Sequence, residues 1–226
     1  MDRKQVEEVL EIRTERYNII TYSRILVDRI TKQAVIFDPS WNFSVIKEKI
    51  DSLGIDIRAV FLTHSHIDHV NLAEKVARYT GAKVYMAQKE IECYGFHCYN
   101  LEKLEDGDII KIGGLEITCI LTPGHTAGSM CYLSKTAFFT GDTIFIEGCG
   151  LCFNDAAASE MYDSLQRVKR IVKPDIIVCP GHYYKRKGEL SFEKVMRYNI
   201  YFQIDKKETF IKFRMRKGQK NLFKFI

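Results

Sequence analysis

Imidazole and carboxylate side chains are concentrated in one short segment, T-H-S-H-I-D-H at residues 63–69. Four metal-compatible residues fall within six positions there: His64, His66, Asp68 and His69. On an extended segment, residues two positions apart point the same way, so His64 and His66 can share one cation. Asp68 and His69 begin a predicted helix and point elsewhere, which suits a second cation nearby. Imidazole and carboxylate ligands without cysteine favour an open, catalytic zinc site, with iron or manganese as alternatives.

Three further candidate ligands each follow a glycine that comes just after a predicted strand. They are His125 in T-P-G-H-T, Asp142 in F-T-G-D-T and His182 in C-P-G-H-Y. A glycine lets the backbone turn sharply, and rigid scaffolds place functional side chains in such loops. Two-metal sites hold their ions roughly 3.5–4 Å apart, a gap that a single carboxylate such as Asp142 could bridge. The remaining histidine, His97, lies in a loop rich in Cys and Tyr and is expected to be structural.

Strands and helices that alternate along the chain must position these residues. Runs of apolar β-formers predict strands at 18–27, 34–37, 58–62, 83–86, 108–112, 115–121, 130–133, 137–140 and 175–179. Apolar residues at helical spacing predict helices at 43–53, 68–79, 88–94, 156–171 and 192–202. This interleaving predicts an α/β class in which helices cover the sheets.

The order of the motifs resembles that of the metallo-β-lactamase superfamily. H-S-H-I-D-H is followed by P-G-H-T, G-D-T-I-F and P-G-H, and the match runs from Asp38-Pro39 to His182. The resemblance implies a four-layer αββα sandwich with a two-metal site at one edge, loaded with two zinc ions. It also implies the ligand roles, which are His64, His66 and His125 for the first ion, Asp68, His69 and His182 for the second, and Asp142 as the bridge.

A finer resemblance indicates the substrate. The run G-D-T-I-F-I-E-G-C-G (141–150) with A-S-E-M-Y-D-S (158–164) is similar to the glyoxalase II branch, which hydrolyses thioesters. Leu151 stands where glyoxalase II usually has a basic residue, which disfavours glutathione thioesters. The compact length and the P-G-H-Y-Y segment are most similar to the zinc-dependent acyl hydrolases of bacterial polyketide, and hence antibiotic, biosynthesis. That resemblance implies hydrolysis of acyl thioesters on the phosphopantetheine arm of an acyl carrier protein.

Other activities of the same superfamily stay open from the sequence. One is glyoxalase II-like hydrolysis of a small-thiol ester, and another is a persulfide dioxygenase with a single iron. A module that binds RNA or a carrier protein without turnover is a further class, which the complete ligand set disfavours. Nucleases with this fold usually carry nucleic-acid-binding insertions, for which this compact chain has no room. No nucleic-acid partner is therefore expected.

The expected chemistry follows from two adjacent cations. A water that bridges two divalent cations has its pKa lowered from about 15.7 toward about 7, so hydroxide is available at neutral pH. Asp68 is the expected catalytic residue, because its carboxylate could orient that hydroxide. The leaving thiolate has a conjugate acid of pKa about 8.5, so no strong general acid is needed.

Residues next to the ligands are expected to bind substrate or to orient the ligands. Phe145 and Leu151 suit an apolar acyl chain, and Tyr183 and Tyr184 could line the substrate mouth. Three hydroxyls and one carboxylate could orient the metal ligands, namely those of Thr63, Thr126, Thr143 and Asp38. Asp38 could equally cap the next turn.

The length and the charge pattern predict the domain organisation. A chain of 226 residues with 46% apolar residues is expected to form one hydrolase domain over residues 1–204, followed by a basic tail at 205–226. The tail holds eight Lys or Arg against two acidic residues, a net charge of +6. We expect it to be packed on or to extend from the domain, either simply solvated or steering an acidic carrier protein toward the site. Its interleaved phenylalanines would also permit contact with a membrane surface or RNA.

The cysteines and the N-terminal segment indicate the compartment. Seven scattered cysteines, a charged first stretch and no apolar run near the roughly 18 residues of a membrane span favour a cytoplasmic protein that does not cross a membrane. Cys149 and Cys152 form a lone C-x-x-C, for which we expect ordinary packing. The oligomeric state stays open.

Overall fold

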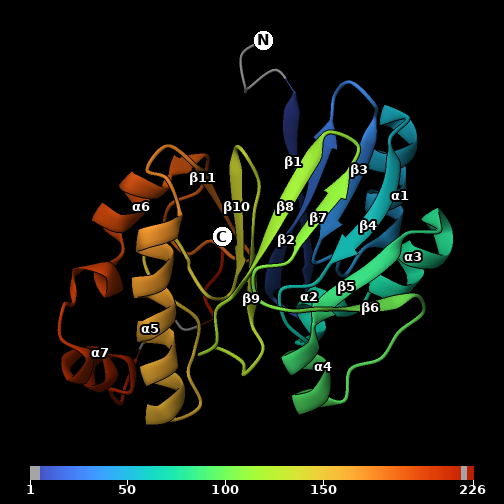
Figure 1. The fold of residues 1–226 in the computed structure, drawn as a ribbon. Helices are drawn as coiled ribbons and strands as arrows, with labels where there is room; N and C mark the ends of the chain where they lie inside the picture. The colour runs from blue at the N-terminus through green and yellow to red at the C-terminus, as the bar shows by residue number, and fades with distance from the viewer. Residues whose placement is uncertain (1–5, 220–222) are drawn as a thin grey trace.

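Two six-stranded β-sheets stack face to face in the computed structural model, which describes residues 6–219 and 223–226 (Figure 1). The first sheet has the order β1 (Glu7–Arg16), β2 (Ile19–Asp28), β3 (Gln33–Phe37), β4 (Asp56–Phe61), β5 (Lys83–Ala87) and β6 (Leu101–Leu104). The second has the order β12 (Leu190–Ser191), β11 (Ile177–Pro180), β10 (Ala137–Gly141), β9 (Met130–Leu133), β8 (Leu115–Leu121) and β7 (Ile109–Ile112). Strands β3 to β6 are parallel, as are β10 and β11, and the other pairs are antiparallel.

Helices cover the outer faces of both sheets (Figure 1). Those that follow strands of the first sheet are α1 (Phe43–Leu53), α2 (Ile67–Val70), α3 (Ala73–Thr80) and α4 (Gln88–Tyr94). Those that follow strands of the second sheet are α5 (Asp155–Ile171), α6 (Phe192–Tyr198), the 3-10 helix η2 (Ile200–Gln203) and α7 (Lys207–Arg214). The predicted α/β class with a four-layer αββα sandwich is confirmed.

Three apolar clusters hold the four layers together. Ile46 of α1 and Val76 of α3 pack on the outer face of the first sheet. Between the two sheets, the ring of Phe37 stacks on that of Phe139 with 3.7 Å between their centroids. Leu165 of α5 belongs to the third cluster, which lies between the second sheet and its helices. Burial on both faces explains why the central strands appear in the sequence as short continuous apolar runs.

Local signals place most helix and strand ends close to their predicted positions. The predicted helix 43–53 is α1, because Asn42 accepts hydrogen bonds from the N–H groups of Ser44 and Val45 at its start. At its end Gly54 adopts φ +58, a left-handed conformation that glycine takes without strain. The predicted helix 88–94 is likewise α4.

Two predicted helices are interrupted by contacts from distant parts of the chain. The predicted helix 68–79 divides into α2 and α3, because the N–H of Leu72 donates to the carbonyl of Pro39 at 3.2 Å. The predicted helix 192–202 divides at Asn199, whose side-chain amide donates to the carbonyls of Phe145 and Gly148. A sequence pattern cannot reveal either contact, because each joins residues more than 30 positions apart.

Four elements have no counterpart among those predicted: β1, β6, β12 and α7. Strands β6 and β12 contain four and two residues, too few to show a period. In β1, six of the ten residues are Glu or Arg, which hides the strand pattern. The structure shows β1 at an edge of its sheet, where polar side chains are tolerated and protect against edge-to-edge pairing.

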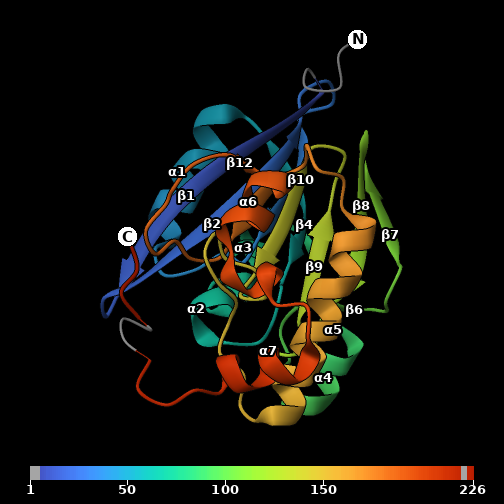
Figure 2. The same ribbon diagram turned by 90° about the vertical axis from the view of Figure 1, so that its left-hand side faces the viewer.

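Much of the segment expected as a basic tail packs on the body of the protein. Helix α7 contacts α5, where the fully buried ring of Phe210 meets that of Tyr162 at 5.4 Å. The end of the chain lies beside the first sheet in Figure 2, where the N–H of Ile226 donates to the carbonyl of Tyr183 at 2.9 Å. Lys220 and Leu222 of the expected tail lie outside the described residues.

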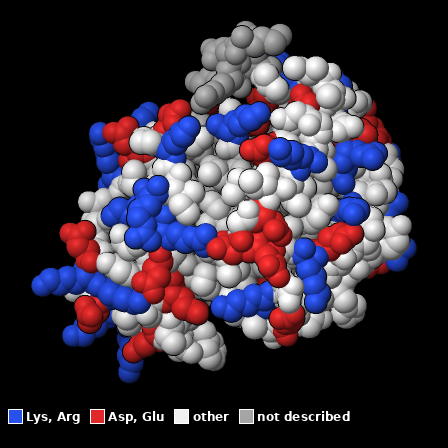
Figure 3. Space-filling model, viewed as in Figure 1, with Lys and Arg blue, Asp and Glu red and all other residues white. Residues whose placement is uncertain are grey.

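The surface carries charges of both signs. On the face viewed in Figure 3, basic and acidic side chains lie beside one another rather than in separate areas. Over the described ranges, the structure contains no helix long and apolar enough to span a bilayer.

Candidate metal centre

The seven predicted ligands converge from loops that follow strand ends. The loop after β4 carries His64, His66, Asp68 and His69, and the last two belong to α2. His125 lies between β8 and β9. Asp142 and His182 directly follow the parallel strands β10 and β11, whose carboxyl ends meet at the same edge of the sheet.

Three imidazoles form the first ligand cluster. The Nδ1 atom of His66 lies 3.0 Å from Nε2 of His64 and 3.0 Å from Nε2 of His125. The three nitrogens therefore face one point, as ligands of a single cation must. His66 is exposed, so this side of the centre opens to solvent.

The second cluster consists of Asp68, His69 and His182. The Nε2 atoms of the two histidines are 3.3 Å apart, and Oδ2 of Asp68 lies 3.3 Å from Nε2 of His182. All three donor atoms lie within 4.8 Å of one another. This is a mixed imidazole and carboxylate set, which suits zinc, iron or manganese.

Asp142 stands between the two clusters with one oxygen toward each. Its Oδ1 lies 3.3 Å from Nε2 of His69 and 3.4 Å from Nε2 of His182, while its Oδ2 lies 3.6 Å from Nε2 of His125. The Oδ1 atom is buried and has no hydrogen-bond partner among the described residues. A buried carboxylate oxygen without a donor is costly unless a cation compensates it. The donor set therefore fits a pair of metal ions with Asp142 as the shared ligand.

In most of these histidines, the ring nitrogen that faces away from the centre is hydrogen-bonded, so that the other ring nitrogen faces the centre. Nδ1 of His125 lies 2.7 Å from the carbonyl of Leu151, and Nδ1 of His182 lies 2.6 Å from that of Ile20. A carbonyl only accepts, so each Nδ1 donates and carries the proton. The Nε2 lone pairs are thereby presented to the centre, as metal ligation requires.

Asp38 orients ligands of both clusters. Its Oδ2 lies 2.8 Å from Nδ1 of His69 and accepts the hydroxyl of Thr63 at 2.7 Å. That hydroxyl lies 3.0 Å from Nδ1 of His64. Of the two uses expected for Asp38, the structure shows the orienting one, because Asn42 caps the next helix. Thr126 and Thr143 bond to Glu90 and Thr122 instead of to a ligand.

Two glycines of the motifs are required by close packing. Gly141 has φ +47, and a Cβ there would lie 2.3 Å from the hydroxyl of Thr63. A Cβ at Gly181 would lie 2.6 Å from Cε1 of His69. The G-D and P-G-H motifs therefore need glycine because the ligand loops touch at these points, besides any need to turn.

The environment of the centre lowers the pKa of one imidazole and raises that of another. Burial, together with the neighbouring imidazoles, lowers the pKa of His64 well below its ordinary value. Burial also opposes protonation of His69, but the carboxylates of Asp142, Asp38 and Asp68 raise its pKa well above that value. For Asp142, His182 and His69 outweigh the effect of burial and hold its pKa well below the usual range. Asp142 is therefore ionised, as a bridging ligand must be.

Sequence reasoning missed one buried residue that connects the ligand loops, Glu90 of α4. Its Oε1 accepts from the N–H and the hydroxyl of Ser65, which lies between His64 and His66. Its Oε2 accepts from the hydroxyl of Thr126 and the N–H of Gly128, just after His125. A glutamate in a short predicted helix carries no signal that marks it as buried, so only the fold reveals this role.

Three of the four predicted substrate residues line a cavity of about 490 Å³ beside the centre: Phe145, Leu151 and Tyr184. The ring of Phe145 lies 6.1 Å from that of His182. Tyr183 turns away, because successive residues of an extended segment point in opposite directions. Its hydroxyl contacts Arg24 at 3.1 Å instead.

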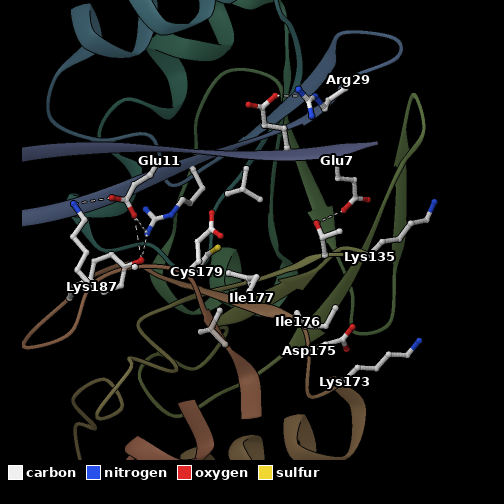
Figure 4. A pocket seen from close by; sticks show the side chains of 18 residues that line it. Glu7, Glu11, Arg29, Lys135, Lys173, Asp175, Ile176, Ile177, Cys179 and Lys187 are labelled. Carbon is white, nitrogen blue, oxygen red and sulfur yellow. Dashed lines mark hydrogen bonds and ion pairs between the residues drawn. The ribbon is translucent and has the colours of Figure 1, made fainter. Parts of the chain in front are cut away.

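Tyr183 lines a larger cavity of about 830 Å³ between β1 and β11 (Figure 4). None of the seven metal-site residues lines it. Five of its charged side chains form ion pairs with one another, Glu11 with Arg24 and with Lys187, each at 3.0 Å, and Glu8 with Arg29 at 3.4 Å. None of the seven ligands lines the smaller cavity either, but two of its lining residues, Leu151 and Phe145, contact the ligands His125 and His182.

Known proteins share the sequence pattern over most of the chain. Residues 23–182 match the profile of the metallo-beta-lactamase superfamily. The chain is 47% identical over 219 residues to the probable polyketide biosynthesis zinc-dependent hydrolases PksB of Bacillus subtilis and BaeB of Bacillus velezensis, covering 96% of this chain and 97% of each relative. It is 36% identical over 159 residues to a hydroxyacylglutathione hydrolase of Serratia proteamaculans, covering 70% of this chain and 61% of the relative.

Solved structures share the fold. A metallo-beta-lactamase from Staphylococcus aureus superposes with a TM-score of 0.83 at 21% identity, over 95% of this chain and 68% of the other. ETHE1 from Myxococcus xanthus superposes with a TM-score of 0.79 at 28% identity, over 95% and 94%. With the profile match, the near full-length relatives and the fold in agreement, this chain is a member of the metallo-beta-lactamase superfamily.

Proposed function

We propose that this protein is a zinc-dependent thioesterase of polyketide biosynthesis that hydrolyses acyl groups from the phosphopantetheine arm of an acyl carrier protein. The observation that carries the proposal is the pair of ligand clusters sharing Asp142, open to solvent at His66 and flanked by a cavity with an apolar wall. The similarity to PksB and BaeB over nearly their full lengths supports the zinc ions and the polyketide context.

Each proposed ion would be bound by one of the two ligand clusters. The cluster of three histidines would hold one zinc ion, the cluster that contains Asp68 would hold the other, and Asp142 would lie between them. When bound, zinc supplies Lewis-acid polarisation of a carbonyl and a water nucleophile at neutral pH.

Asp68 is placed to orient the attacking water. Its carboxylate is half-buried, next to the exposed His66 and Ile67 at the opening of the site. Burial raises the pKa of Asp68, but His69 and His182 outweigh that effect and lower it. The carboxylate is therefore ionised at neutral pH and accepts a hydrogen bond from a water beside the thioester carbonyl.

The cavity wall and the leaving group complete the proposal. Phe145 is buried and Leu151 is half-buried, so together they offer an apolar surface to an acyl chain. A thiolate leaves without a strong acid because the pKa of its conjugate thiol is only about 8.5. A thioester therefore does not require a strong general acid at the site.

A second candidate is a glyoxalase II-like hydrolase of a small-thiol ester. The 36% identity to a hydroxyacylglutathione hydrolase favours it. The two candidates differ only in the thiol that carries the acyl group, so one comparison separates them.

The experiment measures hydrolysis of an acyl carrier protein thioester and of a glutathione thioester by the zinc-loaded protein. We expect the carrier thioester to be preferred, and His66→Ala to abolish turnover and to release zinc. His97→Ala serves as the matched control, because His97 is exposed and belongs to neither cluster. Preference for the glutathione thioester selects the second candidate. Oxygen uptake by an iron-loaded protein without thioester hydrolysis overturns both.

A further inference from the structure

Arg214 is a buried cation with no acidic partner among the residues that the structure describes. Its side chain lies in the last turn of α7, and the residue is only 4% exposed. No acidic residue of the described ranges forms an ion pair with it. Its Nε atom is buried and has no hydrogen-bond partner in the described chain. An unpaired buried charge is destabilising, so this position calls for an anion.

The groups around Arg214 are neutral. Its Nη1 donates to the hydroxyl of Tyr201 at 2.7 Å. The thiols of Cys149 and Cys152 also lie close to it. Burial raises the pKa of Cys152 to about 11 and that of Cys149 higher still, so both thiols are protonated at neutral pH. None of these neighbours supplies the missing negative charge.

Arg214 lines the cavity beside the metal centre together with three more cations, Lys185, Arg216 and Lys224. One acidic residue lines it, Glu147, whose Oε1 pairs with Arg186 at 3.5 Å. The excess of positive charge therefore faces a space of about 490 Å³. Two of the lining residues each have a buried polar atom without a hydrogen-bond partner among the described residues, the donor Nε of Arg214 and the acceptor Oε2 of Glu147.

Two residues that line the same cavity also contact ligands of the metal centre. The carbonyl of Leu151 holds Nδ1 of His125, and the ring of Phe145 packs beside His182. A molecule that fills the cavity therefore has one end near the ligand clusters and the other among the cations of α7 and the chain end. It must carry an anion and a hydrogen-bond donor between that anion and the reacting group.

We propose that this cavity binds the phosphate end of the thiol that carries the acyl group, with Arg214 and Arg216 on the phosphate and Glu147 on an amide N–H of the pantetheine arm. This inference rests on the proposed thioesterase function and names its thiol-binding subsite. Guanidinium groups suit phosphate because their planar donors match its oxygens. Coenzyme A and a carrier protein both present this phosphate.

The first experiment measures turnover with two substrates that differ only in the phosphate, acyl-pantetheine and acyl-4′-phosphopantetheine. The zinc-loaded protein should hydrolyse the phosphorylated substrate with a kcat/KM roughly ten- to a hundredfold higher, the range for one hydrogen bond to a charged group. In Arg214→Gln and in Arg216→Gln the ratio of the two kcat/KM values should fall toward one. Arg170→Gln, an exposed arginine on α5, removes the same charge outside the cavity and should keep the ratio.

A second experiment separates this inference from the proposed function. Calorimetry with S-methyl 4′-phosphopantetheine and S-methyl pantetheine measures binding without turnover and without a thiolate. Tighter binding of the phosphorylated compound, lost in Arg216→Gln, supports the subsite even if no thioester is hydrolysed. Arg216 is exposed, so this variant should fold if Arg214→Gln does not.

Three results would overturn the inference. One is equal turnover of the two pantetheine thioesters by the unmodified protein. Another is equal calorimetric affinity for the two S-methyl compounds. The third is a kcat/KM that is higher for a glutathione thioester than for acyl-4′-phosphopantetheine and that falls to the same extent in Arg214→Gln. Comparing acyl-coenzyme A with the acyl carrier protein then identifies the source of the phosphate, and a preference for either one is consistent with the subsite.

Discussion

Glu90 is expected to determine how tightly the first metal ion is held. Its two oxygens accept four hydrogen bonds, two from Ser65 and two from the loop that follows His125. Every ligand of the three-histidine cluster lies next to one of these contacts. The histidines of the second cluster are held by the carbonyl of Ile20 and by Asp38, which also reaches His64 through Thr63. Replacing Glu90 should therefore affect one ion and spare the other.

Glu90→Gln changes the hydrogen bonds with almost no change in volume. The amide keeps one acceptor oxygen, so its NH₂ group must face a backbone N–H, either that of Ser65 or that of Gly128. That buried donor loses its partner, which costs about 1–3 kcal/mol. Groups that orient metal ligands typically contribute tenfold to a hundredfold in affinity. We expect the free energy of unfolding to fall by about 1–3 kcal/mol and the zinc affinity of the first cluster to fall about ten- to a hundredfold.

The assay titrates zinc against a chelator of known affinity and resolves the two dissociation constants. Glu92→Gln on the same helix is the matched control, because Glu92 is exposed and its polar partners among the described residues are Gln88 and Lys103. If Glu90→Gln binds both zinc ions as the unmodified protein does and unfolds at the same urea concentration, the assignment of Glu90 as a positioning residue is refuted.

The remaining predictions concern the bridge, a pH-dependent turn and the cysteines. Asp142→Asn should lower the zinc content from two ions toward one or none, measured by elemental analysis, because a neutral amide cannot compensate two cations; full loading would contradict the bridging role. Asp28 accepts from the N–H groups of Ile30 and Gly114 and from the hydroxyl of Thr31. Burial raises the pKa of Asp28, but these hydrogen bonds outweigh burial and lower it below its ordinary value. The stability that ionised Asp28 contributes is therefore present above its pKa in the unfolded chain, about 4, and is lost as the pH falls through its lower pKa in the folded protein. Asp28→Asn should therefore destabilise by about 1–3 kcal/mol at pH 7 and by less near pH 3 in urea titrations; a constant difference would be evidence against it. Iodoacetamide at neutral pH should modify the exposed Cys93 well before Cys149, whose buried thiol has a raised pKa, as followed by mass spectrometry; early labelling of Cys149 would show that the C-x-x-C is accessible.

The candidate ligands could be named from the sequence because the chemistry of a metal site restricts residue types strongly. Four metal-compatible residues in six positions are hard to explain by packing alone. The glycines before Asp142 and His182 indicated two more loops that carry ligands. Helix α1 has its predicted bounds, and the residues that cap it in the structure, Asn42 and Gly54, act within one turn of its ends. Local interactions of this kind are fully contained in a short stretch of sequence.

The tertiary structure alone decided which distant groups share a space. It brought Glu90 to the loops of His64 and His125, turned Tyr183 away from the site, and buried Arg214 beside the cavity without an acid. It also divided the helix predicted after His66, because the N–H of Leu72 donates a hydrogen bond to the carbonyl of Pro39. Each of these facts depends on contacts between residues far apart in the chain, and composition and periodicity carry no information about such pairs. The sequence therefore determined the kind of chemistry, and the packing of its loops determined what orients the ligands and what lines the space beside them.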